Sequence, residues 1–267
     1  MKIISVQFDY PGTNKYKILS QVFEHSVKKN CPNAELELIK VKPPQWRNRR
    51  GKSLASNTLK LDLWLEALER TEDDIIFIDC DMLILKNLES AFDTDFDIGY
   101  TKRTKGKPPY NGGVVFVRNT EPAKEFIKTW SRINNKMYAN PEMHTPYRDK
   151  YAGMNQAAFG YIMEKKEYTA KLKEFPCKIW NACDDDWRDI STETRVMHIK
   201  SGLRRQVLAS HEIPTLYNRA IIVWKNYAIE AGLINGIRKR IDNVFVMPTH
   251  PLIKRVRGLR NRRRKII

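Results

Sequence analysis

The first half of the chain alternates between short apolar runs and longer amphipathic segments. Apolar residues dominate 3–8, 75–78 and 114–117, whereas 35–41 alternates between apolar and polar side chains. Each of these patterns predicts a strand, and the run at 75–78, bounded by acidic residues, is typical of a strand buried on both faces.

Helical periodicity separates these predicted strands. Segments 16–30, 53–70 and 122–133 place apolar residues along one side of a helix. Strands that alternate with helices indicate an open, mostly parallel α/β sheet, which binds ligands at the carboxyl ends of its strands. Beyond residue 134 the pattern is less regular, and it predicts helices at 153–164 and 214–231 and a strand at 194–199.

Two aspartates follow the buried run at 75–78. Asp79 and Asp81 are two residues apart, so on an extended chain their carboxylates point the same way. A divalent cation held there would bridge a diphosphate and neutralise charge on a leaving group. The other Asp-x-Asp pairs, within 93–97 and 184–186, lie in polar stretches and are interpreted as loop or surface.

Further polar motifs stand at the ends of predicted elements. Asn111-Gly112-Gly113 precedes the strand at 114–117, Asn155-Gln156 lies in the helix at 153–164, and Asp9-Tyr10 follows the first strand. His198 lies near the end of the strand at 194–199. Lys60 extends the apolar side of the helix at 53–70, where a lysine either points into a site or snorkels at the surface.

Taken in order over roughly residues 3 to 205, these motifs resemble the glycogenin-like and bacterial galactosyltransferase-like retaining glycosyltransferases. The resemblance implies a GT-A fold, which is a Rossmann-like, open, mixed and mostly parallel sheet. It implies a nucleotide-sugar-binding and catalytic domain at 1–210, followed by a helical extension and basic tail at 211–267. It also implies transfer of a hexose, with retention, from a UDP-sugar or another nucleoside-diphosphate sugar to a hydroxyl.

The resemblance assigns roles to individual residues. Asp79, Asp81 and His198 would hold Mn²⁺ or Mg²⁺. The catalytic pair at the reacting face of the sugar would be Gln156 and Asn155. The donor sugar would contact Asn111, Gly112 and Gly113, and the donor nucleotide and diphosphate would contact Asp9, Tyr10, Lys60, Lys200 and Arg204.

The chain departs from the family pattern in two places. Asn155 stands where the family has aspartate, which keeps the shape and loses the charge. The family's His-x-x-Gly is His198-Ile199-Lys200-Ser201-Gly202 here, with the glycine one position late. Three side chains therefore remain candidates for the diphosphate: Lys200, Arg204 and Arg205.

Positive charge is the most prominent feature of the composition. The net charge is +17, and eight basic residues lie between Lys254 and Lys265. Without these eight residues the net charge would still be 17 − 8 = +9. Such a balance suits nucleic acid, an anionic membrane surface or an acidic substrate.

The positions of the basic residues indicate which class of acceptor the protein uses. Predicted loops carry Lys102, Arg103, Lys105 and Lys107, which suggests a polyanion, and the leading hypothesis is DNA with hydroxymethylated bases. The alternative is a cell-surface or lipid-linked glycan at an anionic membrane, with the tail 252–267 as an interfacial helix. Asp185, in the acidic cluster 184–186, is a further acceptor-side candidate, since an inverting enzyme would need a carboxylate base there.

Two other classes of protein account for part of this pattern. A sugar nucleotidyltransferase shares the fold but needs a glycine-rich first loop, which 9–13 lacks. A non-enzymatic basic binding protein would not need Asp79, Asp81 and His198 together. With no signal peptide, no apolar span and no Cys-x-x-Cys pair, we expect free thiols and a cytoplasmic location, in the host if the gene is a phage's, with the tail allowing attachment to a membrane.

Overall fold

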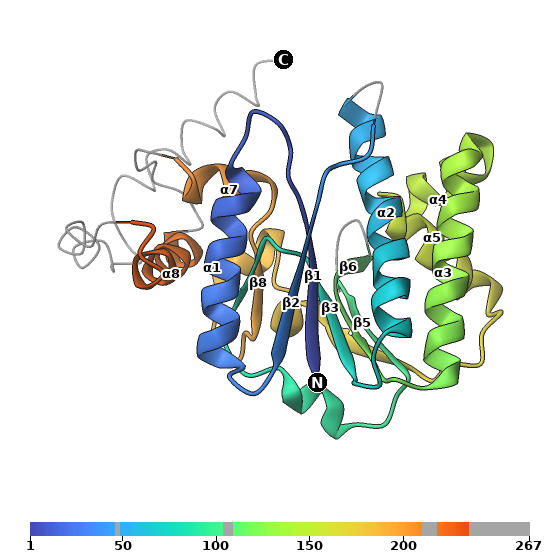
Figure 1. Ribbon diagram of the computed structural model, residues 1–267, viewed down its shortest axis with the longest axis horizontal. Helices are drawn as coiled ribbons and strands as arrows, with labels where there is room; N and C mark the ends of the chain where they lie inside the picture. The colour runs from blue at the N-terminus through green and yellow to red at the C-terminus, as the bar shows by residue number, and fades with distance from the viewer. Residues whose placement is uncertain (46–48, 104–108, 210–217, 235–267) are drawn as a thin grey trace, which may run out of the picture.

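A six-stranded sheet runs through the centre of the computed structural model, which describes residues 1–45, 49–103, 109–209 and 218–234 (Figure 1). Its strand order is β2-β1-β3-β6-β5-β7. β1 is parallel to β2 and β3, and β5 is parallel to β7, whereas β6 is antiparallel to both its neighbours. The strands are β1 (Lys2–Phe8), β2 (Glu35–Val41), β3 (Ile75–Ile78), β5 (Ile98–Lys102), β6 (Tyr110–Val117) and β7 (Leu172–Pro176).

The predicted mixed, mostly parallel α/β sheet is confirmed, and so is the burial of its central strand. Ile75 and Phe77 pack in one hydrophobic cluster, while Ile76 and Ile78 pack in another. All four side chains are fully buried. Alternate residues of β3 therefore serve two cores, because successive side chains of a strand point to opposite faces.

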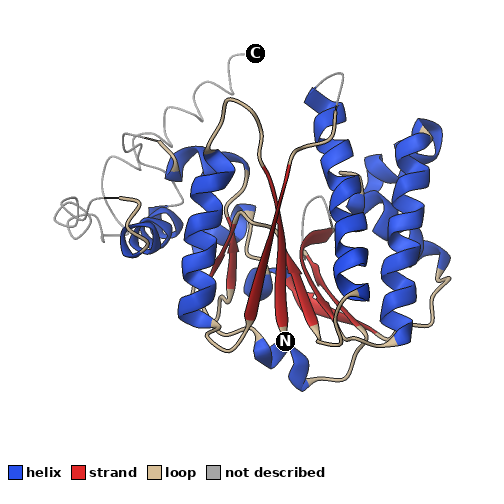
Figure 2. Cartoon of the chain, viewed as in Figure 1, coloured by secondary structure: helices blue, strands red, loops and turns tan. Residues whose placement is uncertain are grey.

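Helices cover both faces of the sheet (Figures 1 and 2). One face carries α2 (Arg49–Glu69), α3 (Glu121–Ala139), α4 (Pro141–Tyr151) and α5 (Asn155–Lys165). On the other side lie α1 (Lys15–Asn30), α7 (Ser201–Val207), α8 (Asn218–Glu230) and a small antiparallel sheet of β4 (Met82–Ile84) and β8 (Val196–His198). The short elements are α6 (Cys177–Trp180) and the 3-10 helices η1 (Glu89–Asp93) and η2 (Asp184–Asp189).

Local chemistry explains how the long helices are placed. Thr120 caps α3 by accepting a hydrogen bond from the Ala123 amide, and Pro122 occupies the first turn, where its missing N–H costs nothing. On α2, Trp64 stacks on Phe77 of β3 with ring centroids 4.7 Å apart. This contact fixes the helix against the strand that precedes Asp79.

Several predicted elements differ in detail. The strand expected at 194–199 is β8. It pairs with β4 outside the main sheet, with Met82 opposite His198. Lys102, expected in a loop, is the last residue of β5. The sequence patterns did not predict β5, β7 or α4.

Of the C-terminal extension, the structure describes residues 218–234, which include α8. Its Trp224 packs in the same hydrophobic cluster as Leu19 of α1, so α8 shares a core with the rest of the protein. Residues 235–267, including the basic tail, lie outside the described residues, and the domain boundary at 210 stays a prediction. Within the described ranges, no helix has the length and apolarity to span a bilayer.

Candidate active site

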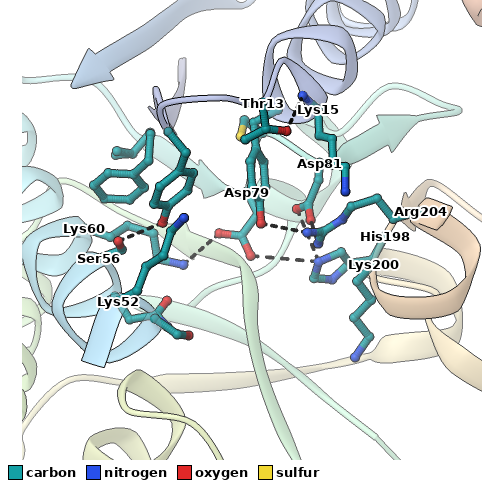
Figure 3. A pocket seen from close by; sticks show the side chains of 17 residues that line it. Thr13, Lys15, Lys52, Ser56, Lys60, Asp79, Asp81, His198, Lys200 and Arg204 are labelled. Atoms are coloured by element: carbon teal, nitrogen blue, oxygen red, sulfur yellow. Dashed lines mark hydrogen bonds and ion pairs between the residues drawn. The ribbon is translucent and has the colours of Figure 1, made fainter. Parts of the chain in front are cut away.

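A cavity of about 810 Å³ lies where β1 and β3 end (Figure 3). This is the edge at which an α/β sheet binds its ligands. Its wall includes the predicted residues Tyr10, Lys60, Asp79, Asp81, His198, Lys200 and Arg204 together with Lys15, Tyr16, Lys52, Ser56 and Asn57.

Strand pairing brings distant residues to this edge. Because β6 is antiparallel to β3, the start of β6 lies beside the end of β3, and the Asp79 amide donates to the Gly113 carbonyl at 2.9 Å. The pairing of β4 with β8 sets His198 next to Asp81, and the Ile199 amide donates to the Asp81 carbonyl at 2.8 Å.

Asp79, Asp81 and His198 form a compact set of possible metal ligands. One ligand atom from each lies within 4.8 Å of the others. His198 Nε2 is 3.4 Å from Asp81 Oδ1 and 4.0 Å from Asp79 Oδ2. Gly113 makes room for the ring, since a Cβ there would lie 3.0 Å from His198 Cε1 and 2.4 Å from Met82 Cε.

The other carboxylate oxygens are held by cations from opposite sides (Figure 3). Lys60 Nζ donates to Asp79 Oδ1 at 2.7 Å, and Arg204 Nη2 donates to Asp81 Oδ2 at 2.5 Å. Asp79 Oδ2 and Asp81 Oδ1 therefore remain on the side of His198 Nε2. Two carboxylate oxygens and an imidazole nitrogen suit Mn²⁺ or Mg²⁺, so the residues present fit such a cation.

Asp81 is ionised despite its depth. Burial raises the pKa of its carboxyl, but His198 in its protonated form, Arg204 and Lys60 together outweigh burial and bring that pKa to about 2. A cation is bound by the carboxylate and not by the acid, so Asp81 is ready to act as a ligand at neutral pH.

Cationic side chains surround this set of ligands. Arg204 also donates to Tyr16 Oη at 2.7 Å and to the Ile199 carbonyl at 3.2 Å, which fixes its guanidinium. Lys200 lies in the cavity wall, 3.1 Å from Asp184 Oδ2, whereas Arg205 is exposed and does not line the cavity. Of the three candidates for the diphosphate, the structure thus brings Lys200 and Arg204 to the cavity.

The aromatic end of the cavity is built on the loop after β1. Tyr10 Oη shares a hydrogen bond of 2.8 Å with Ser56 Oγ, and the Lys52 ammonium lies 3.6 Å from the centre of the Tyr10 ring. Asp9 is exposed, accepts from Gln7 Nε2 at 2.5 Å and lines a neighbouring hollow of about 720 Å³ that shares Tyr10 and Tyr16 with the cavity.

Of the residues expected near the sugar, Gly113 lies beside the His198 ring, whereas Gln156, Asn111 and Gly112 lie outside the cavity's lining. Gln156, Asn111 and Gly112 line one small hollow between α5 and the start of β6. The Asn111 amide is engaged internally, since Oδ1 accepts from Gly113 N at 3.2 Å and Nδ2 donates to Cys183 Sγ at 3.4 Å. Asn155 is 2% exposed, and among the described residues its Oδ1 has no hydrogen-bond partner.

The expected acceptor residues are only partly described. Lys102 forms an ion pair with Glu174 at 2.9 Å, and Arg103 forms one with Asp184 at 2.9 Å. Lys105 and Lys107 lie outside the described residues. Asp185 belongs to η2, and its side chain lies outside the described part of the chain.

The sequence patterns missed several residues of the site. Lys15 and Tyr16 open α1, so the loop after β1 was a signal that they approach the ligand edge. Ser201 occupies the glycine position of His-x-x-Gly and has a positive φ of 48°, so the glycine-like backbone is present without glycine. Asn181 gave no sequence signal, and its amide Oδ1 lies 3.2 Å from His198 Nδ1.

Comparison with solved structures shows the fold. The chain is similar to a glycosyltransferase involved in glycosylation of the major capsid of PBCV-1, with 14% identity and a TM-score of 0.54 over 76% of this chain and 96% of that one. It is similar to galactosyltransferase LgtC, solved with donor and acceptor sugar analogs, with 13% identity and a TM-score of 0.53 over 90% and 99%.

The glycosyltransferase GlyE of Streptococcus pneumoniae is also similar, with 12% identity and a TM-score of 0.54; the match covers 85% of this chain and 60% of GlyE. These neighbours confirm the predicted GT-A fold. The comparison with curated proteins found no match. The profile of the nucleotide-diphospho-sugar transferase family matches residues 42–206, more than half of the 267 residues. This range includes Lys60, Asp79, Asp81, His198 and Arg204, and the chain belongs to the nucleotide-diphospho-sugar transferase family.

Proposed function

We propose that this protein is a metal-dependent glycosyltransferase that moves a hexose from a UDP-sugar to an acceptor hydroxyl. The observation that carries the proposal is the convergence of Asp79, Asp81 and His198 in one cavity with Lys60 and Arg204. Family membership supports the nucleotide-sugar donor.

The cation would be held by Asp79 Oδ2, Asp81 Oδ1 and His198 Nε2. When bound, Mn²⁺ or Mg²⁺ neutralises charge on the diphosphate leaving group as the sugar bond breaks. Lys60 and Arg204, each bound to one carboxylate oxygen, hold the two carboxylates turned toward this position. Lys15, Lys200 and Arg204 also supply charge-assisted donors for diphosphate oxygens from the cavity wall.

For the sugar we propose retention of the anomeric configuration, with Gln156 at the reacting face and Asn155 beside it. The resemblance to retaining enzymes supports this, together with the common hollow of Gln156, Asn111 and Gly112. Proton coupling constants of the product distinguish the two outcomes. An inverted product would contradict retention and direct attention to the acidic cluster 184–186.

For the acceptor we propose a glycan hydroxyl at an anionic surface. Lys102 and Arg103 are each paired with an acidic residue, so they supply less free positive charge for DNA phosphates than the sequence suggested. The solved LgtC complex holds an acceptor sugar analog, which supports a sugar hydroxyl. The net charge of +17 supports the other candidate, DNA with hydroxymethylated bases.

One assay tests the reaction and the acceptor together. The protein is incubated with Mn²⁺ and a panel of nucleotide sugars, alone, with anionic glycolipid vesicles, or with hydroxymethylated duplex DNA. We expect release of UDP that EDTA abolishes and that the glycolipid stimulates. A parallel incubation with a nucleoside triphosphate and a sugar phosphate that releases pyrophosphate would instead identify a nucleotidyltransferase. Sugar added to the DNA, detected by mass spectrometry, would identify the DNA acceptor.

A further inference from the structure

Asn181 lies behind the metal-binding histidine, at the end of α6, and is fully buried. Its side-chain amide makes three polar contacts. Oδ1 lies 3.2 Å from His198 Nδ1, Nδ2 lies 2.9 Å from Thr101 Oγ1, and Nδ2 lies 3.4 Å from the Asn111 carbonyl oxygen. Asn181 thus connects β8 to the paired ends of β5 and β6.

The neighbouring groups determine which end of the amide faces which partner. The Asn111 carbonyl oxygen can only accept, so the Thr101 hydroxyl, 2.8 Å away, donates its hydrogen to it. Thr101 Oγ1 then offers a lone pair to Asn181. The amide atom facing Thr101 and the Asn111 carbonyl is therefore the nitrogen, and a flipped amide would oppose oxygen to oxygen at both contacts.

The orientation of the amide decides the tautomer of His198. Asn181 Oδ1 only accepts, so the hydrogen bond of 3.2 Å requires a proton on His198 Nδ1. A neutral imidazole with its proton on Nδ1 has a free lone pair on Nε2. Nε2 is the atom that faces Asp81 Oδ1 at 3.4 Å and Asp79 Oδ2 at 4.0 Å.

We propose that Asn181 is a positioning residue that fixes His198 in the Nδ1–H form and aims its Nε2 lone pair at the cation site. The inference rests on the proposed metal dependence. It also ties the cation site to the predicted sugar loop, because the same amide nitrogen is held by Thr101 and Asn111. A partner of this kind orients a metal-binding histidine, and its loss costs about 10–100-fold in metal affinity or activity.

The wild-type protein contains its own spectroscopic control. His144 Nε2 lies 2.9 Å from the Gly153 carbonyl oxygen, which can only accept, so the His144 proton sits on Nε2. In metal-free protein labelled with ¹⁵N-histidine, at a pH where the rings are neutral, long-range ¹H–¹⁵N spectra should show opposite tautomers for the two residues. The protein has five histidines, so the signals of His198 and His144 are assigned by substitution. The signals that disappear in His198→Gln belong to His198, and those that disappear in His144→Gln belong to His144.

Three variants separate positioning from structural support. Asn181→Leu removes the acceptor, and Asn181→Asp keeps an oxygen for His198 Nδ1. Asn134→Leu is the matched control, because Asn134 is also fully buried and donates to Thr58 Oγ1 away from the cation site. Mn²⁺ affinity is measured by electron paramagnetic resonance on folded protein, with and without UDP.

We expect Asn181→Leu to weaken Mn²⁺ binding about 10–100-fold, Asn181→Asp to bind closer to wild type, and Asn134→Leu to bind like wild type. A proton on Nε2 of neutral His198 in the wild type, or unchanged Mn²⁺ affinity in Asn181→Leu, would overturn the inference. If the wild type binds no Mn²⁺ with UDP, the proposed metal dependence fails, and the observed tautomer alone decides whether Asn181 positions His198. If Asn181→Leu does not fold, the wild-type tautomer still provides the test.

Discussion

Two regions of this protein each gather three side chains of metal-binding type within 4.8 Å. The cavity cluster is Asp79, Asp81 and His198, and the buried thiol cluster is Cys177, Cys183 and Asp186. The two regions are neighbours, since Asn181 contacts His198 from one side and accepts from Cys177 Sγ through its backbone carbonyl at 3.1 Å.

The two clusters differ in what their polar atoms do. In the cavity cluster, Lys60 and Arg204 take one oxygen from each carboxylate, and the remaining oxygens share an open space with His198 Nε2. In the thiol cluster, the sulfurs lie 4.0 Å apart beneath the surface, and the Asn111 amide donates to both. Both clusters bring three possible ligand side chains equally close together, but of the two only the cavity cluster combines carboxylate oxygens that Lys60 and Arg204 leave available with room for a donor.

The largest difference should appear when one aspartate of each cluster is neutralised. Asp81→Asn removes a ligand charge, so transfer should fall by at least about 100-fold, because cation stabilisation of the transition state is worth several kcal/mol. Asp186→Asn is the matched variant of the thiol cluster and should keep most activity. UDP release at saturating Mn²⁺ measures both, and equal losses would remove the distinction between the clusters.

Arg204 should matter next, because it contacts Asp81 of the cavity cluster. Arg204→Gln loses the hydrogen bond to Asp81 and the proposed one to donor phosphate, and bonds to charged groups contribute about 1.5–3 kcal/mol. We expect a fall in kcat/KM of about 10–100-fold. Steady-state kinetics with varied donor give the value, and Arg205→Gln, at an exposed neighbour, is the control. A comparable fall in the control would point to general loss of positive charge.

Substitution in the thiol cluster should change the stability of the protein and leave its Mn²⁺ dependence unchanged. Cys177 is 3% exposed, and Cys177→Ala deletes one packed atom, which should lower the free energy of unfolding by about 1 kcal/mol. In Cys177→Ala, UDP release should depend on Mn²⁺ concentration as it does in the wild type. Urea denaturation and a Mn²⁺ titration provide the two numbers, and a shifted Mn²⁺ dependence would mean that the thiols take part in cation binding.

The smallest effect is expected at Ser201, next to Lys200 of the cavity wall. Its φ of 48° lies in the left-handed region, which glycine adopts without a steric penalty. Ser201→Gly should raise the free energy of unfolding by about 0.5–1 kcal/mol, since relief of strain exceeds the added flexibility of the unfolded chain. Thermal unfolding checks this, with Gly202→Ala as the neighbouring substitution, and a destabilised Ser201→Gly would show that the serine side chain is needed.

The local sequence was enough to predict the cavity cluster's aspartates. Asp79 and Asp81 directly follow a buried strand, so a short window contains both their burial and their direction. His198 and Lys60 depended on longer patterns: His198 on its place near the end of a predicted strand, and Lys60 on its place beside the apolar side of a predicted helix. The thiol cluster was not predicted, because Cys177 begins α6, Cys183 caps η2 and Asp186 lies in η2, and this spacing contains no Cys-x-x-Cys pair.

Other features depend on contacts that no short window contains. The sequence around Asn181 shows no hydrophobic periodicity that would single it out, and its contacts form only where α6, β5 and β8 meet. β5 is short, and β7 has only one buried residue, so neither gave a strong strand pattern. α4 contains Pro146 and few apolar residues, and Asn140 caps it by accepting from the amides of Glu142 and Met143.

The position of a bound cation tests the central claim most directly. Crystals grown with Mn²⁺ and UDP would be measured at a wavelength where manganese scatters anomalously. We predict one strong anomalous peak within ligand distance of Asp79 Oδ2, Asp81 Oδ1 and His198 Nε2. A peak at Cys177, Cys183 and Asp186, or no peak at the cavity cluster with UDP clearly bound, would contradict the account.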